Sequence, residues 1–167
     1  MKQVLTFLLR VVAASILCNS AYTTLPAAAD AAKDAQAEIT KCYRSIEKGY
    51  YDKEPDQVLK FWTDDYQGIA KKGKSKWLPR DKSEAELRTL FPGNEKFRSP
   101  TRKYKIVSCK LMADMASAVV VVSCYHIDPD LNPSGFNGGN ACGTDKLRHI
   151  WVLTKKGWLI KSEEYVR

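Results

Sequence analysis

The residues with the clearest capacity for acid–base chemistry are two adjacent carboxylates, Asp64 and Asp65, and two histidines, His126 and His149. An isomerase-type reaction needs a carboxylate base in an apolar pocket and a donor for the developing oxyanion. Asp64 or Asp65 can supply that base. Neighbouring side chains on an extended segment point to opposite faces, so at most one of the two carboxylates faces a pocket. Both also fit a structural role, because Asp commonly hydrogen-bonds a turn at the end of a helix.

Aromatic residues are frequent enough to line a pocket as well as to fill a core. The residues that we expect around a ligand are Trp62, Trp151, Tyr43, Tyr66 and Tyr125, and the three tyrosines can also donate a hydroxyl proton. Rings pack equally well against a ring-shaped ligand and against a core, so both roles stay open. The two histidines fall on separate predicted strands with no acid at ligand spacing, and we expect neither a metal nor a cofactor.

The N-terminal residues have the layout of a secretory signal peptide: Lys2, then a mainly apolar run over 4–18, then small residues ending at Ala29. The apolar run of about fifteen residues contains an arginine and is shorter than the roughly twenty that span a bilayer. We therefore expect residues 1–29 to be a signal peptide and residues 30–167 a single domain. The domain is expected to be exported, either periplasmic or secreted, with no permanent membrane anchor.

Four cysteines remain after such cleavage: Cys42, Cys109, Cys124 and Cys142. Exported domains with four cysteines commonly form two disulfides. Cys124 and Cys142 each lie nine residues from the midpoint of a predicted loop, which would place them opposite each other. Cys42 would then pair with Cys109. Four free thiols are the alternative, and a lipid anchor on Cys18 is an alternative to cleavage near Ala29.

The whole chain has 167 residues, a formal net charge of +8 and 44% hydrophobic residues. This length suits one domain, and the apolar content supports a packed core. Basic residues concentrate in 71–82 and 96–105, without a nucleic-acid-binding motif. We expect a solvated surface there and no nucleic-acid partner.

The elements that must position these residues follow from hydrophobic spacing. The predicted helices cover 30–50, 55–62 and 83–91, the last with Ser83 as its N-cap. The predicted strands cover 66–70, 75–78, 104–112, 117–127, 147–154 and 158–166. This order predicts an α+β fold with three N-terminal helices packed on a strongly curved antiparallel sheet.

Several segments resemble the nuclear transport factor 2-like superfamily, which includes SnoaL-like polyketide cyclases and ketosteroid isomerases. The resemblance rests on Phe61–Tyr66, the turn at Gly73, the capped helix from Ser83, Arg148–Leu153 and Gly157–Ile160. It implies a cone-shaped α+β barrel with an interior pocket, often a homodimer through the outer face of the sheet. It also implies that Asp64 and Asp65 lie near the position of an isomerase base.

We expect an exported domain that binds a small, largely apolar molecule or a protein partner without catalysis, because no specific catalytic set accompanies the fold pattern. The first alternative is an isomerase- or cyclase-type enzyme with Asp64 or Asp65 as base, assisted by a tyrosine or His149. The second is a cell-envelope interaction module that uses the basic face.

Overall fold

The structure is a computed structural model that describes residues 24–69, 77–91, 100–128 and 141–166. Contacts divide the chain into two units, Met1–Asp34 and Ala35–Arg167, and the second unit holds the sheet. Most of the predicted signal peptide lies outside the described residues. Among the helices that are described, none combines the length and the hydrophobicity needed to cross a bilayer.

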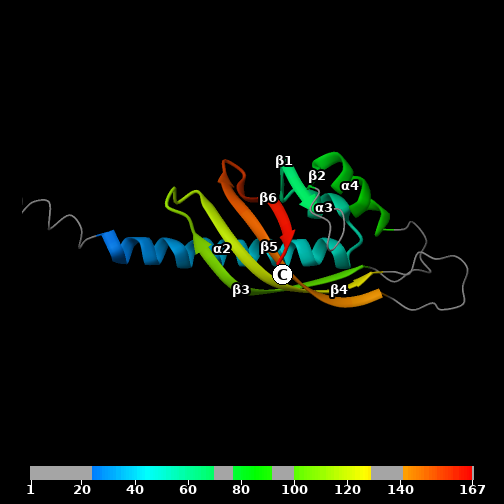
Figure 1. Ribbon diagram of the computed structural model, residues 1–167, viewed down its shortest axis with the longest axis horizontal. Coiled ribbons are helices and arrows are strands. Elements are labelled where there is room, and N and C mark those ends of the chain that lie inside the picture. Colours follow the sequence, from blue (N-terminus) through cyan, green and yellow to red (C-terminus); the bar gives the residue numbers. More distant parts are fainter. Residues whose placement is uncertain (1–23, 70–76, 92–99, 129–140, 167) are drawn as a thin grey trace, which may run out of the picture. The chain divides into compact units, whose positions relative to one another are not determined.

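Three helices are described: α2 (Thr24–Tyr51), α3 (Pro55–Leu59) and α4 (Arg80–Thr89) (Figure 1). The apolar positions of α2 recur at helical spacing, and Ile39, Tyr43, Ile46 and Tyr50 are all buried in the core. The part of α2 from Ala35 onward is therefore an amphipathic helix that packs against the sheet.

Six strands form one sheet in the order β2-β1-β6-β5-β4-β3. The strands are β1 (Trp62–Ile69), β2 (Trp77–Pro79), β3 (Thr101–Leu111), β4 (Ser117–Asp128), β5 (Ala141–Thr154) and β6 (Gly157–Tyr165). The predicted α+β class is confirmed. The prediction of a wholly antiparallel, strongly curved sheet is wrong, because β1 pairs with β6 in parallel and the sheet is neither closed nor strongly curled. Periodicity indicates where strands lie but not which strands become neighbours.

Two predicted element boundaries are wrong. Residues 63–65 do not end a helix but lie inside β1, and α4 begins at Arg80, three residues before the predicted cap. Pro79 precedes α4 in an extended conformation, and the helix starts directly after it. Ser83 is therefore a buried residue within the helix, and its hydroxyl donates a hydrogen bond to the carbonyl of Leu78 at 3.3 Å.

β-Bulges decide which side chains face the interior. In the β5–β6 ladder Ile160 lies opposite Trp151 and Ser162 lies opposite Ile150, so Lys161 is an extra residue without a partner. The extra residue reverses the alternation of β6, and the side chain opposite His149 is consequently Glu163. Residues directly opposite each other share a face of the sheet. A second shift, between Ile106 and Ser108, has the same effect on β3.

The predicted disulfides are not formed, because all four described cysteines are free. In the β4–β5 ladder Cys124 lies opposite Asp145, three positions away from Cys142. The pairing prediction placed the centre of the loop too early, and the register error removed the contact. Cys42 and Cys109 both pack against the core as thiols, and burial raises the pKa of each.

Candidate functional site

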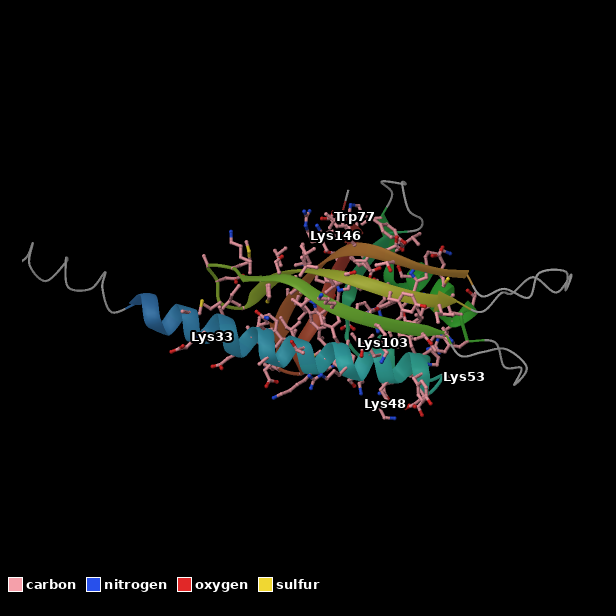
Figure 2. The ribbon with its side chains drawn as sticks, turned by 90° about the horizontal axis from the view of Figure 1, so that it is seen from below. Lys33, Lys48, Lys53, Trp77, Lys103 and Lys146 are labelled. Carbon is pink, nitrogen blue, oxygen red and sulfur yellow. The ribbon has the colours of Figure 1, made fainter. Side chains whose placement is uncertain are left out.

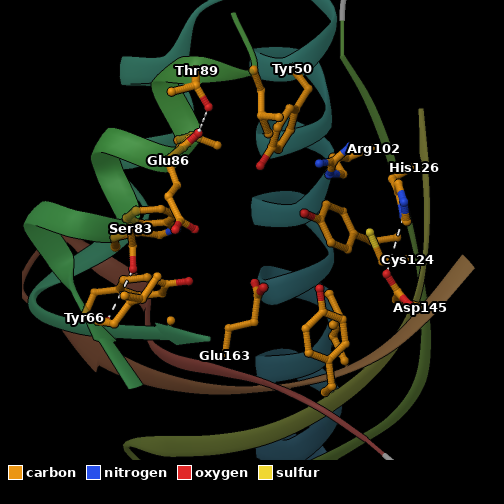
Figure 3. A pocket seen from close by; sticks show the side chains of 18 residues that line it. Tyr50, Tyr66, Ser83, Glu86, Thr89, Arg102, Cys124, His126, Asp145 and Glu163 are labelled. Atoms are coloured by element: carbon orange, nitrogen blue, oxygen red, sulfur yellow. Dashed lines mark hydrogen bonds and ion pairs between the residues drawn. The ribbon is translucent and has the colours of Figure 1, made fainter. Parts of the chain in front are cut away.

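A cavity of about 390 Å³ lies between the inner face of the sheet, α4 and the last turn of α2 (Figure 3). All of these elements contribute polar or aromatic side chains to its wall. These are Tyr50, Trp62, Tyr66, Ser83, Glu86, Thr89, Arg102, Tyr104, Cys124, His126, Asp145, Glu163 and Tyr165. The volume is within the range of sites that bind small organic molecules, roughly 300–1,000 Å³.

Glu163 is the carboxylate that reaches the middle of this cavity (Figure 3). The bulge at Lys161 turns its side chain inward, beside His149 on the neighbouring strand. The Nε2 atom of His149 lies 3.1 Å from Oε2 of Glu163, and the histidine is only 1% exposed. The N–H direction is not aligned with that oxygen, so the two atoms are close without forming a well-formed hydrogen bond.

A buried hydrogen-bond chain supports His149 from behind. The indole N–H of Trp151 donates to the hydroxyl oxygen of Tyr43 at 3.0 Å, and this oxygen lies 2.7 Å from Nδ1 of His149. The Tyr43 oxygen accepts a hydrogen bond from Trp151, so its own O–H can donate a hydrogen bond to Nδ1. In a neutral imidazole the remaining proton is then on Nε2, the nitrogen that faces Glu163.

The electrostatics of the cavity combine carboxylates, among them Glu163 with a lowered pKa, with neutral tyrosine hydroxyl groups. Burial raises the pKa of Glu163, but contact with His149 and the charge of Arg102 outweigh it, and the pKa lies below its ordinary value. Burial, with a further contribution from the charge of Glu163, raises the pKa of Tyr66 and of Tyr104 well above the usual range. At neutral pH the two tyrosines are therefore available as hydrogen-bond donors.

The opposite wall holds a second polar group. Arg102 on β3 lies directly opposite His126 on β4, and Nδ1 of His126 is 3.7 Å from Oδ2 of Asp145. The guanidinium of Arg102 lies 5.0 Å from the ring centroid of Tyr50, a cation–π contact. Cys124 lies on the same wall, and burial raises its pKa to about 12, so the thiol is uncharged.

Two of the five predicted pocket aromatics line the cavity. Trp62 and Tyr66 stack with ring centroids 4.0 Å apart and an interplanar angle of 6°. Tyr43 and Trp151 lie one layer behind the wall, as does the predicted catalytic residue His149. Tyr125 is 43% exposed and does not line this cavity, because the register of β4 places its neighbour Cys124 on the inner face.

The two predicted catalytic carboxylates lie at the surface. Asp65 is 3.5 Å from Lys161, Asp64 is 3.8 Å from Arg80, and neither lines the cavity. The β1–β6 register shifts between Trp62 and the residues that follow, so strict alternation is lost and both adjacent carboxylates face solvent. Neither carboxylate belongs to this cavity; both line separate surface hollows, one beside Arg80 and one beside Lys161, and their role as a base stays a prediction.

Sequence reasoning missed the carboxylate that does face the cavity, Glu163. Trp158 and Ile160 mark the inner face of β6, and strict alternation from them would place Glu164 inside and Glu163 outside. No residue in the segment signals the bulge, because the unpaired residue is an ordinary lysine rather than a glycine. Arg102 was missed because it belongs to the basic segment 96–105, which we expected to be solvated surface.

Comparison with known proteins identifies the fold. No protein-family model and no curated protein sequence matches the chain. Solved structures do match: an NTF2-like protein of unknown function from Shewanella oneidensis MR-1 superposes with a TM-score of 0.59 at 14% identity, over 77% of this chain and 95% of that chain. A putative scytalone dehydratase from Novosphingobium aromaticivorans gives 0.65 at 12% identity, over 83% and 93%.

A nuclear transport factor 2 superfamily protein from Salmonella enterica serovar Typhimurium gives a TM-score of 0.61 at 14% identity, over 80% of this chain and 91% of that chain. The chain therefore has the nuclear transport factor 2-like fold, as the resemblance of its sequence predicted. The similar structures include enzymes and proteins of unknown function, so the fold does not define the activity, which has to be argued from the cavity.

Proposed function

We propose that this protein binds a small organic molecule inside the cavity, without chemical conversion of it. The observation that carries the proposal is the composition of the wall. Stacked and tilted rings, including Trp62 and Tyr66, offer apolar area, while the Glu163 carboxylate and two buried phenols offer a small number of fixed polar contacts. Ligand sites in proteins typically combine these two features.

The proposal is tested by ligand screening with an internal reporter. Trp62 lines the cavity and Trp77 does not, although both are tryptophans on neighbouring strands. Ring-containing small molecules that raise the Tm are expected to change the tryptophan fluorescence. The response should be lost in Trp62→Phe and kept in the matched control Trp77→Phe. Binding whose signal is unaffected by Trp62→Phe would place the ligand elsewhere and contradict the proposal.

An acid–base enzyme is a second candidate, favoured by the presence of Glu163 and Tyr66 in one cavity. Glu163 would take a proton from a bound carbon acid, and Tyr66 would donate a hydrogen bond to the oxyanion. A base acting at neutral pH works best with a pKa near 7, whereas the pKa of Glu163 is lowered. The lowered pKa of Glu163 makes it a weak base at neutral pH, and this favours binding over catalysis.

The enzyme candidate has its own measurement. Catalysed deuterium exchange at the α-carbon of a small cyclic ketone, followed by NMR, should require Glu163 if proton abstraction occurs. The matched control is Glu164→Gln, because Glu164 lies opposite Arg148 and forms an ion pair with it at the surface. Exchange no faster than in buffer, or equal in Glu163→Gln and Glu164→Gln, would exclude Glu163 as the base.

We also propose export of the domain, on the pattern of residues 2–29 alone. N-terminal sequencing of the protein recovered from a secreting host tests it. A mature N-terminus near residue 30 is expected, and recovery of the intact chain inside the cell would contradict it.

A further inference from the structure

We infer that the ligand of this cavity is a cation, namely an organic ammonium compound with a small ring. The inference rests on the proposed function, since it assumes that the cavity is the binding site, and it adds the chemical class of the ligand.

The first argument is the charge of the wall. Three carboxylates line the cavity, those of Glu86, Asp145 and Glu163, against one arginine, Arg102. No lysine is among the described lining residues, although the whole chain carries a net charge of +8. Lysines such as Lys103 and Lys146 are exposed instead (Figure 2). The protein is basic outside and acidic inside this cavity.

The second argument is that two of the carboxylates have no lysine or arginine paired with them in the described part of the chain. Among the described residues, neither Glu86 nor Glu163 forms an ion pair with a lysine or an arginine. Both point toward the same open space in Figure 3. Glu163 has only His149, whose N–H is not aligned with it. Glu163 is half-buried, whereas Glu86 is exposed at the rim of the cavity. A half-buried carboxylate is stabilised by a cation, and a ligand ammonium would provide one.

The third argument is the aromatic character of the wall. The rings around the carboxylates belong to Tyr50, Trp62, Tyr66, Tyr104 and Tyr165. Ring faces attract cations within about 6 Å. Arg102 already lies 5.0 Å from the ring centroid of Tyr50, so the protein itself places a cation against one of these rings. An ammonium group beside Glu163 would contact both the negatively charged carboxylate and the face of an aromatic ring.

An anionic ligand fits this wall less well. It would approach Glu163 and Glu86 as like charges, while Arg102 is held at the far wall with Tyr50. A neutral ligand would make no charge–charge contact with Glu163 or Glu86. Among ring compounds of similar size, the acidic wall of the cavity therefore favours the one that carries a positive charge.

The experiment compares three probes of equal size that differ in charge: 2-phenylethylamine, 2-phenylethanol and phenylacetate. Isothermal titration at neutral pH is expected to give an affinity for the amine about tenfold above that for the alcohol, with phenylacetate weakest. In Glu163→Gln the ratio of amine to alcohol affinity should fall close to one. The matched control Glu164→Gln should retain the wild-type ratio.

The outcomes separate this inference from the proposed function. Equal affinity for amine and alcohol, or a preference for phenylacetate, overturns the inference that the ligand is a cation. The proposal that the cavity is a ligand site then still stands. Absence of binding by all three probes, with no response of Trp62, counts against both. If Glu163→Gln does not fold, Glu86→Gln at the rim supplies the same comparison, and an unchanged amine-to-alcohol ratio in that variant overturns the inference.

Discussion

Removal of the Tyr43 hydroxyl is the sharpest test of the buried chain behind the cavity. Tyr43→Phe keeps the ring, and therefore the packing, but deletes the acceptor of the Trp151 indole N–H and the partner of His149 Nδ1. Trp151 is 0% and His149 1% exposed, so water cannot replace the lost partner. Leaving a buried polar group without a partner costs about 1–3 kcal/mol, and two such groups give an expected loss of about 2–6 kcal/mol.

The measurement is urea unfolding followed by far-UV circular dichroism. The midpoint should fall while the m-value stays constant, which shows that the loss is one of stability rather than of two-state behaviour. Tyr125→Phe is the matched control, because Tyr125 is an exposed tyrosine, and it should change the free energy of unfolding by less than about 0.5 kcal/mol.

A double-mutant cycle isolates the hydrogen bond between Trp151 and Tyr43. Combining Tyr43→Phe with Trp151→Phe should cost less than the sum of the two single losses, because both substitutions remove the same hydrogen bond. A loss below about 1 kcal/mol for Tyr43→Phe, or strict additivity in the cycle, would refute the account of His149 as a residue held in place by this chain.

Three further predictions concern ionisation. The raised pKa values of Tyr66 and Tyr104 predict a free energy of unfolding that is constant below about pH 10 and falls above it, because the unfolded chain releases these protons first. Urea unfolding midpoints between about pH 9 and 12 measure this loss. An unchanged midpoint would contradict the prediction. The lowered pKa of Glu163 predicts stability that is present above about pH 4.3 and lost on acidification, with a shallower loss in Glu163→Gln. Among the described cysteines, exposed Cys142 should react with a thiol reagent well before Cys124, whose pKa is raised to about 12, and equal rates would argue against the burial of Cys124.

The fold was largely predictable because its periodicity is strong. The apolar spacing of Ile39, Tyr43, Ile46 and Tyr50 marks a helix with one buried face, and all four are buried. The alternation from Trp158 to Ile160 likewise identifies the start of the last strand. Such local patterns depend on neighbours along the chain, which the sequence displays directly.

The site was less predictable because it depends on contacts between distant segments. β1 joins the sheet beside β6, at the end of the chain, and nothing in Trp62–Ile69 indicates that partner. The inward position of Glu163 depends on a bulge at Lys161, and the failed Cys124–Cys142 pairing on a loop whose centre was placed too early. A one-residue error in register moves a side chain to the other face of a sheet.

The unpaired Lys161 also has a consequence for how this strand tolerates insertions and deletions. Deletion of that residue would leave a regular strand with Ile160 opposite Trp151 and Glu163 still opposite His149. Keeping Lys161 and flattening the bulge would instead bring Glu164 to the inner face. Two consecutive glutamates thus give the cavity an acid in either alignment of the strand, but only the bulged or shortened alignment keeps that acid beside the histidine.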